Sequence, residues 1–150
     1  MICAMFRLMI LTLFVLSCSV GSSRGGEDSD AGKDIVRAAN AFLNSLDDEQ
    51  RAEATFDFDN AERENWHYVP KDRLGLAIRE MSPEQQEAAF RLAGATLSAE
   101  GLSKTKDIIY LESFLWEREG RPDYRDPGKY YVTIFGKPVS QGTWGWRFEG

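Results

Sequence analysis

Three polar side chains stand out because each lies among apolar or aromatic neighbours: those of His67, Glu112 and Arg147. His67 is the only histidine of the chain and lies between Trp66 and Tyr68. Histidine changes its charge near neutral pH, which suits it to acid–base catalysis, but a hydrogen-bonded structural histidine fits the same surroundings. We expect the structural role for His67 and keep the catalytic role as the alternative.

Glu112 projects from the apolar stripe of a predicted helix, with Ile109 on one side and Leu115 on the other. A carboxylate in such a stripe either pairs with a cation or becomes available for acid–base chemistry. We expect it to form a structural bridge with Arg147 or another arginine. An acid–base role and simple exposure to solvent are the alternatives.

Tryptophan side chains offer a second kind of chemistry, because aromatic platforms bind the flat apolar faces of ligands such as sugars. Trp66, Trp144 and Trp146 are the candidates for such a ligand-binding surface. Core packing is the competing interpretation, since tryptophans on strands usually bury their large surface against helices. We expect core packing and keep sugar stacking as the alternative.

Other chemistries are disfavoured by the residues themselves. The single histidine, together with two cysteines that both lie near the N-terminus, Cys3 and Cys18, provides no metal site. Neither Ser113 nor Ser140 lies on the glycine-flanked turn that a serine nucleophile needs, and no glycine-rich phosphate loop is present. The formal net charge of −6 argues against a nucleic-acid surface. We therefore expect no metal, no cofactor and no nucleic-acid partner.

The N-terminal segment predicts export from the cell. Arg7 precedes an apolar run over residues 8–16 that is too short to anchor stably in a bilayer but is typical of a signal peptide, which we place at residues 1–17. The polar residues that follow, 18–31, are predicted to form a flexible tether.

The end of the signal peptide, Val15-Leu16-Ser17-Cys18, resembles the bacterial lipobox. The resemblance implies that Cys18 is lipidated and attaches the protein to a membrane of the cell envelope. Ordinary cleavage after Ser17 or near Gly21 is the alternative, and it predicts a periplasmic or secreted protein.

Helical periodicity begins near Gly32 and continues through a short second helix to about Thr55. Ser82, followed by a proline and then by Gln85, predicts a capped helix start. Ser98 is positioned to cap a further helix, which glycine and proline end near residue 120.

Residues 130–135 and 144–148 then read as an antiparallel β-hairpin with its turn at residues 136–142. A hairpin alone is marginal in water. We therefore predict an α+β fold, with N-terminal helices followed by a hairpin that begins an incomplete sheet, and assign residues 32–150 to the N-terminal part of one domain. The helices are expected to cover one face of the sheet and to leave large aromatic side chains uncovered, which favours self-association.

Three stretches carry a family resemblance: Asn65-Trp66-His67-Tyr68-Val69-Pro70, Leu97-Ser98-Ala99-Glu100-Gly101, and residues 125–150 ending in Trp144-Gly145-Trp146-Arg147-Phe148-Glu149-Gly150. From about residue 35 to its last residue, the chain resembles the N-terminal part of the bacterial domain-of-unknown-function family 3500. The resemblance implies further strands and a pair of histidines beyond residue 150, and it implies no particular activity.

Two functions are consistent with these patterns for an uncharacterised exported protein. One is a hydrolase-like enzyme, whose site would join His67, Glu112 and Arg147 to histidines that lie beyond the C-terminus. The other is a non-catalytic ligand-binding or envelope-interaction module that uses the aromatic hairpin.

Overall fold

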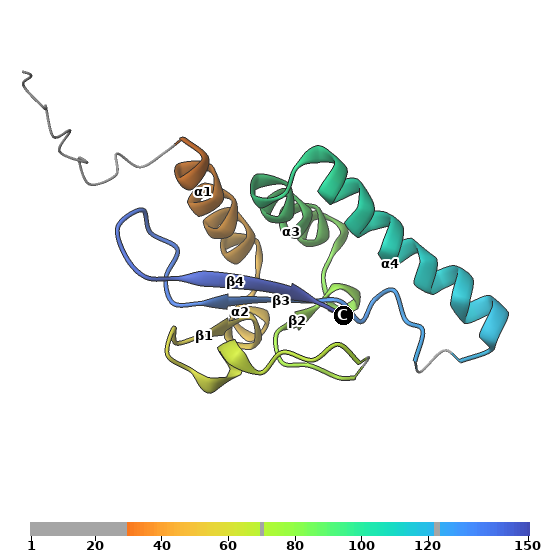
Figure 1. The fold of residues 1–150 in the computed structure, drawn as a ribbon. Coiled ribbons are helices and arrows are strands. Elements are labelled where there is room, and N and C mark those ends of the chain that lie inside the picture. The colour runs from red at the N-terminus through yellow and green to blue at the C-terminus, as the bar shows by residue number, and fades with distance from the viewer. Residues whose placement is uncertain (1–29, 70, 122–123) are drawn as a thin grey trace, which may run out of the picture.

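The computed structural model describes residues 30–69, 71–121 and 124–150. In these residues it has four α-helices, two short 3₁₀-helices and four strands that form one mixed sheet (Figure 1). The predicted α+β class is confirmed, because helices come first and the two longer strands come last. The predicted signal peptide and residues 18–29 of the predicted tether lie outside the described residues.

Local sequence explains where the helices begin and end. The helices are α1 (Asp30–Ser45), α2 (Asp48–Ala54), α3 (Pro83–Thr96) and α4 (Ala99–Glu119). The Ser82 hydroxyl accepts a hydrogen bond from the Gln85 amide, and the Gln85 side chain accepts one from the Ser82 amide, which confirms the predicted capping box. Ser98 caps α4 as predicted, and Gly120 ends that helix with a φ of 63°.

Strand β3 (Tyr131–Phe135) is the centre of the sheet, and all of its residues are buried. Strand β4 (Gly145–Glu149) pairs with one of its edges in antiparallel fashion, which confirms the predicted hairpin. The other edge is shared by β2 (Leu76–Ala77), which is antiparallel, and β1 (Thr55–Phe56), which is parallel. Sequence analysis misses β1 and β2 because two residues are too few to show an alternating pattern.

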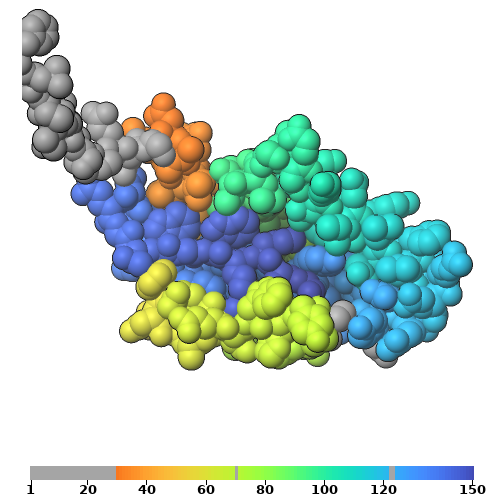
Figure 2. All heavy atoms as spheres, in the orientation of Figure 1, coloured from red at the N-terminus to blue at the C-terminus, as the bar shows by residue number. Residues whose placement is uncertain are grey.

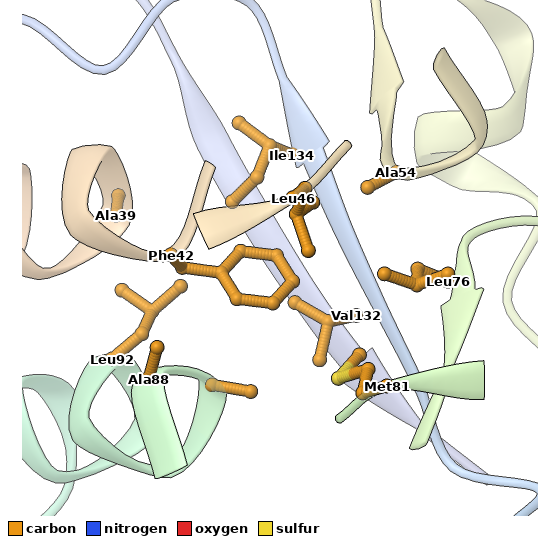
Figure 3. Close-up of a cluster of buried hydrophobic side chains, with 11 residues drawn as sticks. Ala39, Phe42, Leu46, Ala54, Leu76, Met81, Ala88, Leu92, Val132 and Ile134 are labelled. Carbon is orange, nitrogen blue, oxygen red and sulfur yellow. The ribbon is translucent and has the colours of Figure 1, made fainter. Parts of the chain in front are cut away.

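One face of the sheet packs against α1 and α3 and forms the apolar core (Figure 3). Phe42 of α1 and Leu92 of α3 are fully buried there, against Val132 and Ile134 of β3. Burying one such side chain completely stabilises the fold by about 1.5–3 kcal/mol. This core is therefore the main source of stability for the described residues.

The aromatic side chains of the return strand extend this core. Trp144, Trp146 and Phe148 are half-buried and pack against the apolar cluster. The expectation that they lie uncovered is therefore wrong, because α1 and α3 together are wide enough to reach the strand at the edge of the sheet.

The opposite face of the sheet is covered by a segment with little regular structure, residues 57–69 and 71–75, which we call the covering segment (Figure 1). Beneath it, Tyr131, Thr133 and Phe135 are buried. Gly75, with a φ of 110°, allows the backbone to approach so closely that a Cβ atom there would collide with the Thr133 hydroxyl. The α-helices thus cover one face of the sheet, as expected, and this segment covers the other.

Helix α4 differs from the other three helices because none of its residues is buried. It begins beside α3 and extends away from the sheet, so that it forms the outer edge of the molecule on the side opposite α1 (Figure 2). None of the described helices combines the length and the apolar character needed to cross a membrane.

Candidate functional site

Two polar sites lie on the side of the sheet that carries the covering segment. The first is a chain of four charged side chains, Arg73–Glu149–Arg147–Glu62. The distances are 2.9 Å from Arg73 Nη1 to Glu149 Oε2, 2.6 Å from Arg147 Nε to Glu149 Oε1, and 2.7 Å from Arg147 Nη2 to Glu62 Oε1. The middle contact is an ion pair whose atoms are not aligned as a hydrogen bond. We call this chain the ion network.

Regular structure positions three of the four members of the ion network. Arg147 and Glu149 alternate along β4 and therefore point to the same face of the sheet. Glu62 lies in a 3₁₀-helix, Ala61–Glu64, that the Asn60 side chain caps. Arg73 ties the covering segment to the chain end, because its Nη2 donates hydrogen bonds to the backbone carbonyls of residues 67, 69 and 150.

The ion network balances its own charges, with two cations and two anions that are at most 11% exposed. Burial raises the pKa of Glu62, but hydrogen bonds from Asn65 and Arg147 and the charges of Arg147 and Lys71 outweigh that effect and hold the pKa below its ordinary value. The Nη atoms of both arginines donate to carboxylates and carbonyls, and their Nε atoms are buried inside the network. The network therefore serves as an internal brace.

His67 lies beside the ion network and is exposed. Its Nε2 is 2.9 Å from the Asn65 side-chain oxygen, while its backbone carbonyl accepts from Arg73. Among the described residues, no group of three or more histidines, cysteines and acids is arranged to hold a metal ion.

The second site is a cavity of about 320 Å³ between α4, the segment 124–130 that leads into β3, and the covering segment. Its wall contains three aromatic side chains, Tyr68, Tyr124 and Tyr130. We call it the tyrosine cavity. The remaining lining residues are Lys71, Glu112, Arg125, Asp126, Lys129 and Gly150.

Glu112 enters the tyrosine cavity from α4 and is held there by Arg125. The closest distance, from Arg125 Nη1 to Glu112 Oε2, is 3.5 Å, and Arg125 also contacts Glu119 at 3.0 Å. The expected bridge to an arginine is thus present, but its partner is Arg125 rather than Arg147. Burial, followed by the nearby charge of Glu112, raises the pKa of Tyr130.

The cations of the cavity differ in how strongly they are engaged. Lys129 Nζ lies 3.0 Å from the Asp72 carboxylate, and this contact lowers the pKa of Asp72. Lys71 forms no ion pair with any residue that the structure describes. Its ammonium group is therefore the cation that an incoming anion can use.

The structure does not bring the three sequence candidates together. No hydrogen bond or ion pair among the described residues joins any two of the side chains of His67, Glu112 and Arg147. Of the candidate aromatic residues, Trp66 is 63% exposed in the covering segment. Trp144 and Trp146 pack against the core on the opposite face of the sheet, so the three form no common platform.

Sequence reasoning missed the tyrosines and Lys71 as site residues. They lie in two turn-rich stretches that are far apart in the chain, and neither stretch shows a motif. The one available signal is the density of aromatic and basic residues between positions 121 and 130.

A family model described as "Protein of unknown function (DUF3500)" matches residues 28–150, which include every described element. The chain belongs to this family. Membership in DUF3500 confirms the family that the residues of the covering segment, α4 and the hairpin resemble, and it assigns no activity to the tyrosine cavity. Comparison with curated proteins and with solved structures found no match.

Proposed function

We propose that this chain is an exported, non-catalytic binding domain that holds a small carboxylated ring compound, of the size of a sugar acid, in the tyrosine cavity. One observation carries the proposal. Three tyrosine side chains line a single cavity together with Lys71, which has no ion-pair partner among the described residues, and Glu112, which α4 contributes to the lining, is already paired with an arginine.

The size and aromatic wall of the cavity support a ring-shaped ligand. A volume of about 320 Å³ is near the lower end for small-molecule sites, which fits one monosaccharide-sized ring better than a chain of rings. Tyr124 and Tyr130 offer flat faces for stacking, and their hydroxyl groups can donate to or accept from ligand hydroxyls.

The charges support an anionic ligand. Arg125 and Lys129 are engaged with carboxylates of the protein, so they hold the wall together rather than attract ligand. Lys71 lacks such a partner in the described part of the chain, and a ligand carboxylate would supply one.

The pairing of Glu112 supports binding rather than catalysis. A general acid or base must be free to exchange a proton with the ligand, whereas the Glu112 carboxylate faces the guanidinium group of Arg125. His67 faces Asn65 and does not line the tyrosine cavity. Among the described residues, His67 and Glu112 therefore do not form the acid–base pair that the hydrolase-like alternative would need in this cavity.

Isothermal titration calorimetry of the full chain tests the proposal, with D-glucuronate as probe and D-glucose as the neutral control. We expect glucuronate to bind and glucose to bind at least about tenfold more weakly, since it lacks the carboxylate that pairs with Lys71. Lys71→Ala should weaken glucuronate binding about tenfold. Lys33→Ala, which removes an exposed lysine of α1, is the matched control and should change nothing.

Two results would contradict the proposal. Equal affinity for D-glucuronate and D-glucose would show that Lys71 does not bind the ligand carboxylate. Release of p-nitrophenol from p-nitrophenyl glucuronide by the wild type, lost in Glu112→Gln, would show an enzyme and return Glu112 to a catalytic role.

Export and lipid attachment form the other part of the proposal, and they are supported by the apolar run and by the lipobox-like residues that end in Cys18. We expect radiolabelled palmitate to enter the wild-type protein and to be lost in Cys18→Ala. Bacterial lipoproteins carry several acyl chains, which together anchor stably where a single chain does not. Recovery of the wild type from the cytoplasm would refute this part alone.

A further inference from the structure

Helix α4 carries an exposed stripe, in which a charged residue lies at each end of an apolar pair, on the side that faces away from the body. Its four residues are Asp107, Leu111, Phe114 and Arg118. Spacings of four, three and four residues place all four side chains within about 60° of one another around the helix axis. Glu112, which enters the tyrosine cavity, points in a different direction, about 100° or more from each of them.

The apolar half of the stripe is uncovered. Leu111 is 51% exposed and Phe114 is 52% exposed, and Tyr110 beside them is 74% exposed. Large apolar side chains that are grouped on one helix face, rather than scattered, mark a surface that a partner covers. In Figure 2 this helix forms a projecting ridge, so a partner can approach it freely.

The charged half of the stripe identifies the partner. Asp107 and Arg118 are both exposed, and neither has an ion-pair partner in the part of the chain that the structure describes. They lie at opposite ends of the apolar pair. The midpoint between Asp107 and Arg118 is also the midpoint between Leu111 and Phe114, and both fall between Glu112 and Ser113.

We propose that two copies of this chain associate through α4 in antiparallel orientation, about a two-fold axis that passes between Glu112 and Ser113. In this arrangement Leu111 of each copy meets Phe114 of the other, and Asp107 of each copy meets Arg118 of the other. A two-fold interface must be self-complementary in this way, and the stripe satisfies this condition for charge and for apolar contact together.

Other partners fit the stripe less well. A helix that lies on a membrane carries mainly lysine and arginine beside its apolar face, whereas here an acid occupies one end of the stripe. The parallel orientation of two copies would place Asp107 against Asp107 and Arg118 against Arg118, and like charges in contact oppose association. The inference does not depend on any ligand in the tyrosine cavity.

Charge reversal tests both the partner and the orientation. Sedimentation equilibrium of the full chain, in a density-matched non-ionic detergent, should show a reversible dimer. Asp107→Arg and Arg118→Asp, each alone, should weaken the dimer about tenfold or more, because each places two like-charge contacts in the interface. An equimolar mixture of the two variants should dimerise about as well as the wild type, since every contact between unlike copies then joins opposite charges.

Glu117→Arg is the matched control, because it makes the same charge change about a quarter turn away from the stripe and should leave the dimer unchanged. Circular dichroism of each variant should match the wild type, since all three substituted positions are exposed. A wild type that stays monomeric at about 100 μM would overturn the proposal. So would a dimer that neither single variant weakens, or a mixture that fails to restore association.

Discussion

The two faces of the central strand are stabilised in different ways. Toward α1 and α3, Val132 and Ile134 belong to the cluster of apolar side chains that includes Phe42. Toward the covering segment, Thr133 donates a hydrogen bond to the Leu74 carbonyl and pairs across the strands with Arg147 of the ion network. The first face is held by helices with strong local signals, and the second by a segment that has almost no secondary structure of its own.

The helices and the covering segment require different kinds of contacts from their side chains. An apolar face tolerates any side chain of suitable volume, because the hydrophobic effect has no direction. A segment without helix or strand must satisfy its backbone groups individually, which Arg73 does for three carbonyls at once. Removal of a polar side chain on the covering-segment face should therefore lower stability because it leaves buried polar groups without partners. Removal of an apolar side chain on the α1–α3 face should lower stability because it leaves a cavity.

The largest effect is expected in the apolar core. Phe42→Ala should lower the free energy of unfolding by about 4 kcal/mol, because it leaves a cavity where a fully buried ring now packs. Denaturant unfolding followed by tryptophan fluorescence measures it. Val139→Ala, at a position 44% exposed in the hairpin turn, should change the free energy by less than about 0.5 kcal/mol. Equal losses for the two variants would contradict the assignment of the core.

The ion network should show the next largest effect. Arg73→Met should cost about 3 kcal/mol, because it strips Glu149 of one partner and leaves backbone carbonyls unsatisfied. Lys33→Met removes an exposed pair with Asp30 and should cost less than about 0.5 kcal/mol. If Arg73→Met is as mild as Lys33→Met under the same denaturant titration, the covering segment is not braced as described.

Gly75→Ala tests the close approach of the covering segment to β3. It should cost about 2 kcal/mol, because the new Cβ atom meets the Thr133 hydroxyl and the φ of 110° is unfavourable for alanine. Gly145→Ala, where a Cβ atom meets nothing within 4 Å, is the control and should be nearly neutral. A stable Gly75→Ala variant would mean that the two segments are not in contact.

The smallest expected effect is on the pH dependence of the unfolding free energy, which should involve the ion network on one face of the sheet and not the apolar core on the other. The pKa of Glu62 is lower in the folded protein, so the unfolded chain binds more protons at acid pH and stability falls as pH decreases. The contribution is complete above the ordinary glutamate pKa of about 4.3 and disappears as pH falls through the lower folded value. Glu62→Gln should therefore reduce the slope of unfolding free energy against pH between about pH 5 and pH 3. Phe42→Ala should leave that slope unchanged.

Sequence reasoning located the parts of the fold that depend on near neighbours. The capping box at Ser82 and Gln85, the left-handed glycine at position 120 and the alternation of residues along β4 all involve contacts within a few residues. Such contacts are encoded locally, so helix starts, helix ends and the hairpin could be predicted. The family could also be identified, because its residues stand in unbroken strings.

For the candidate site, the sequence identified Glu112 and its need for an arginine, but not which arginine. Arg125 and Arg147 both follow Glu112 in the chain, and only the path of the segment after α4 brings Arg125 to a distance of 3.5 Å from Glu112. The tyrosines of the cavity come from residues 68, 124 and 130, and no local pattern connects the first with the other two.

The sequence by itself therefore determined the helices, their caps, the hairpin, the family and the presence of a carboxylate that needed a cation. Only the tertiary structure decided that β1 and β2 join the sheet, that an irregular segment covers its second face, and that the stripe on α4 stays exposed. The physical reason is the distance along the chain: Arg73 meets Glu149, and Glu62 meets Arg147, across separations of 76 and 85 residues. Contacts over such distances depend on how whole elements pack, which the period of a single helix or strand does not encode.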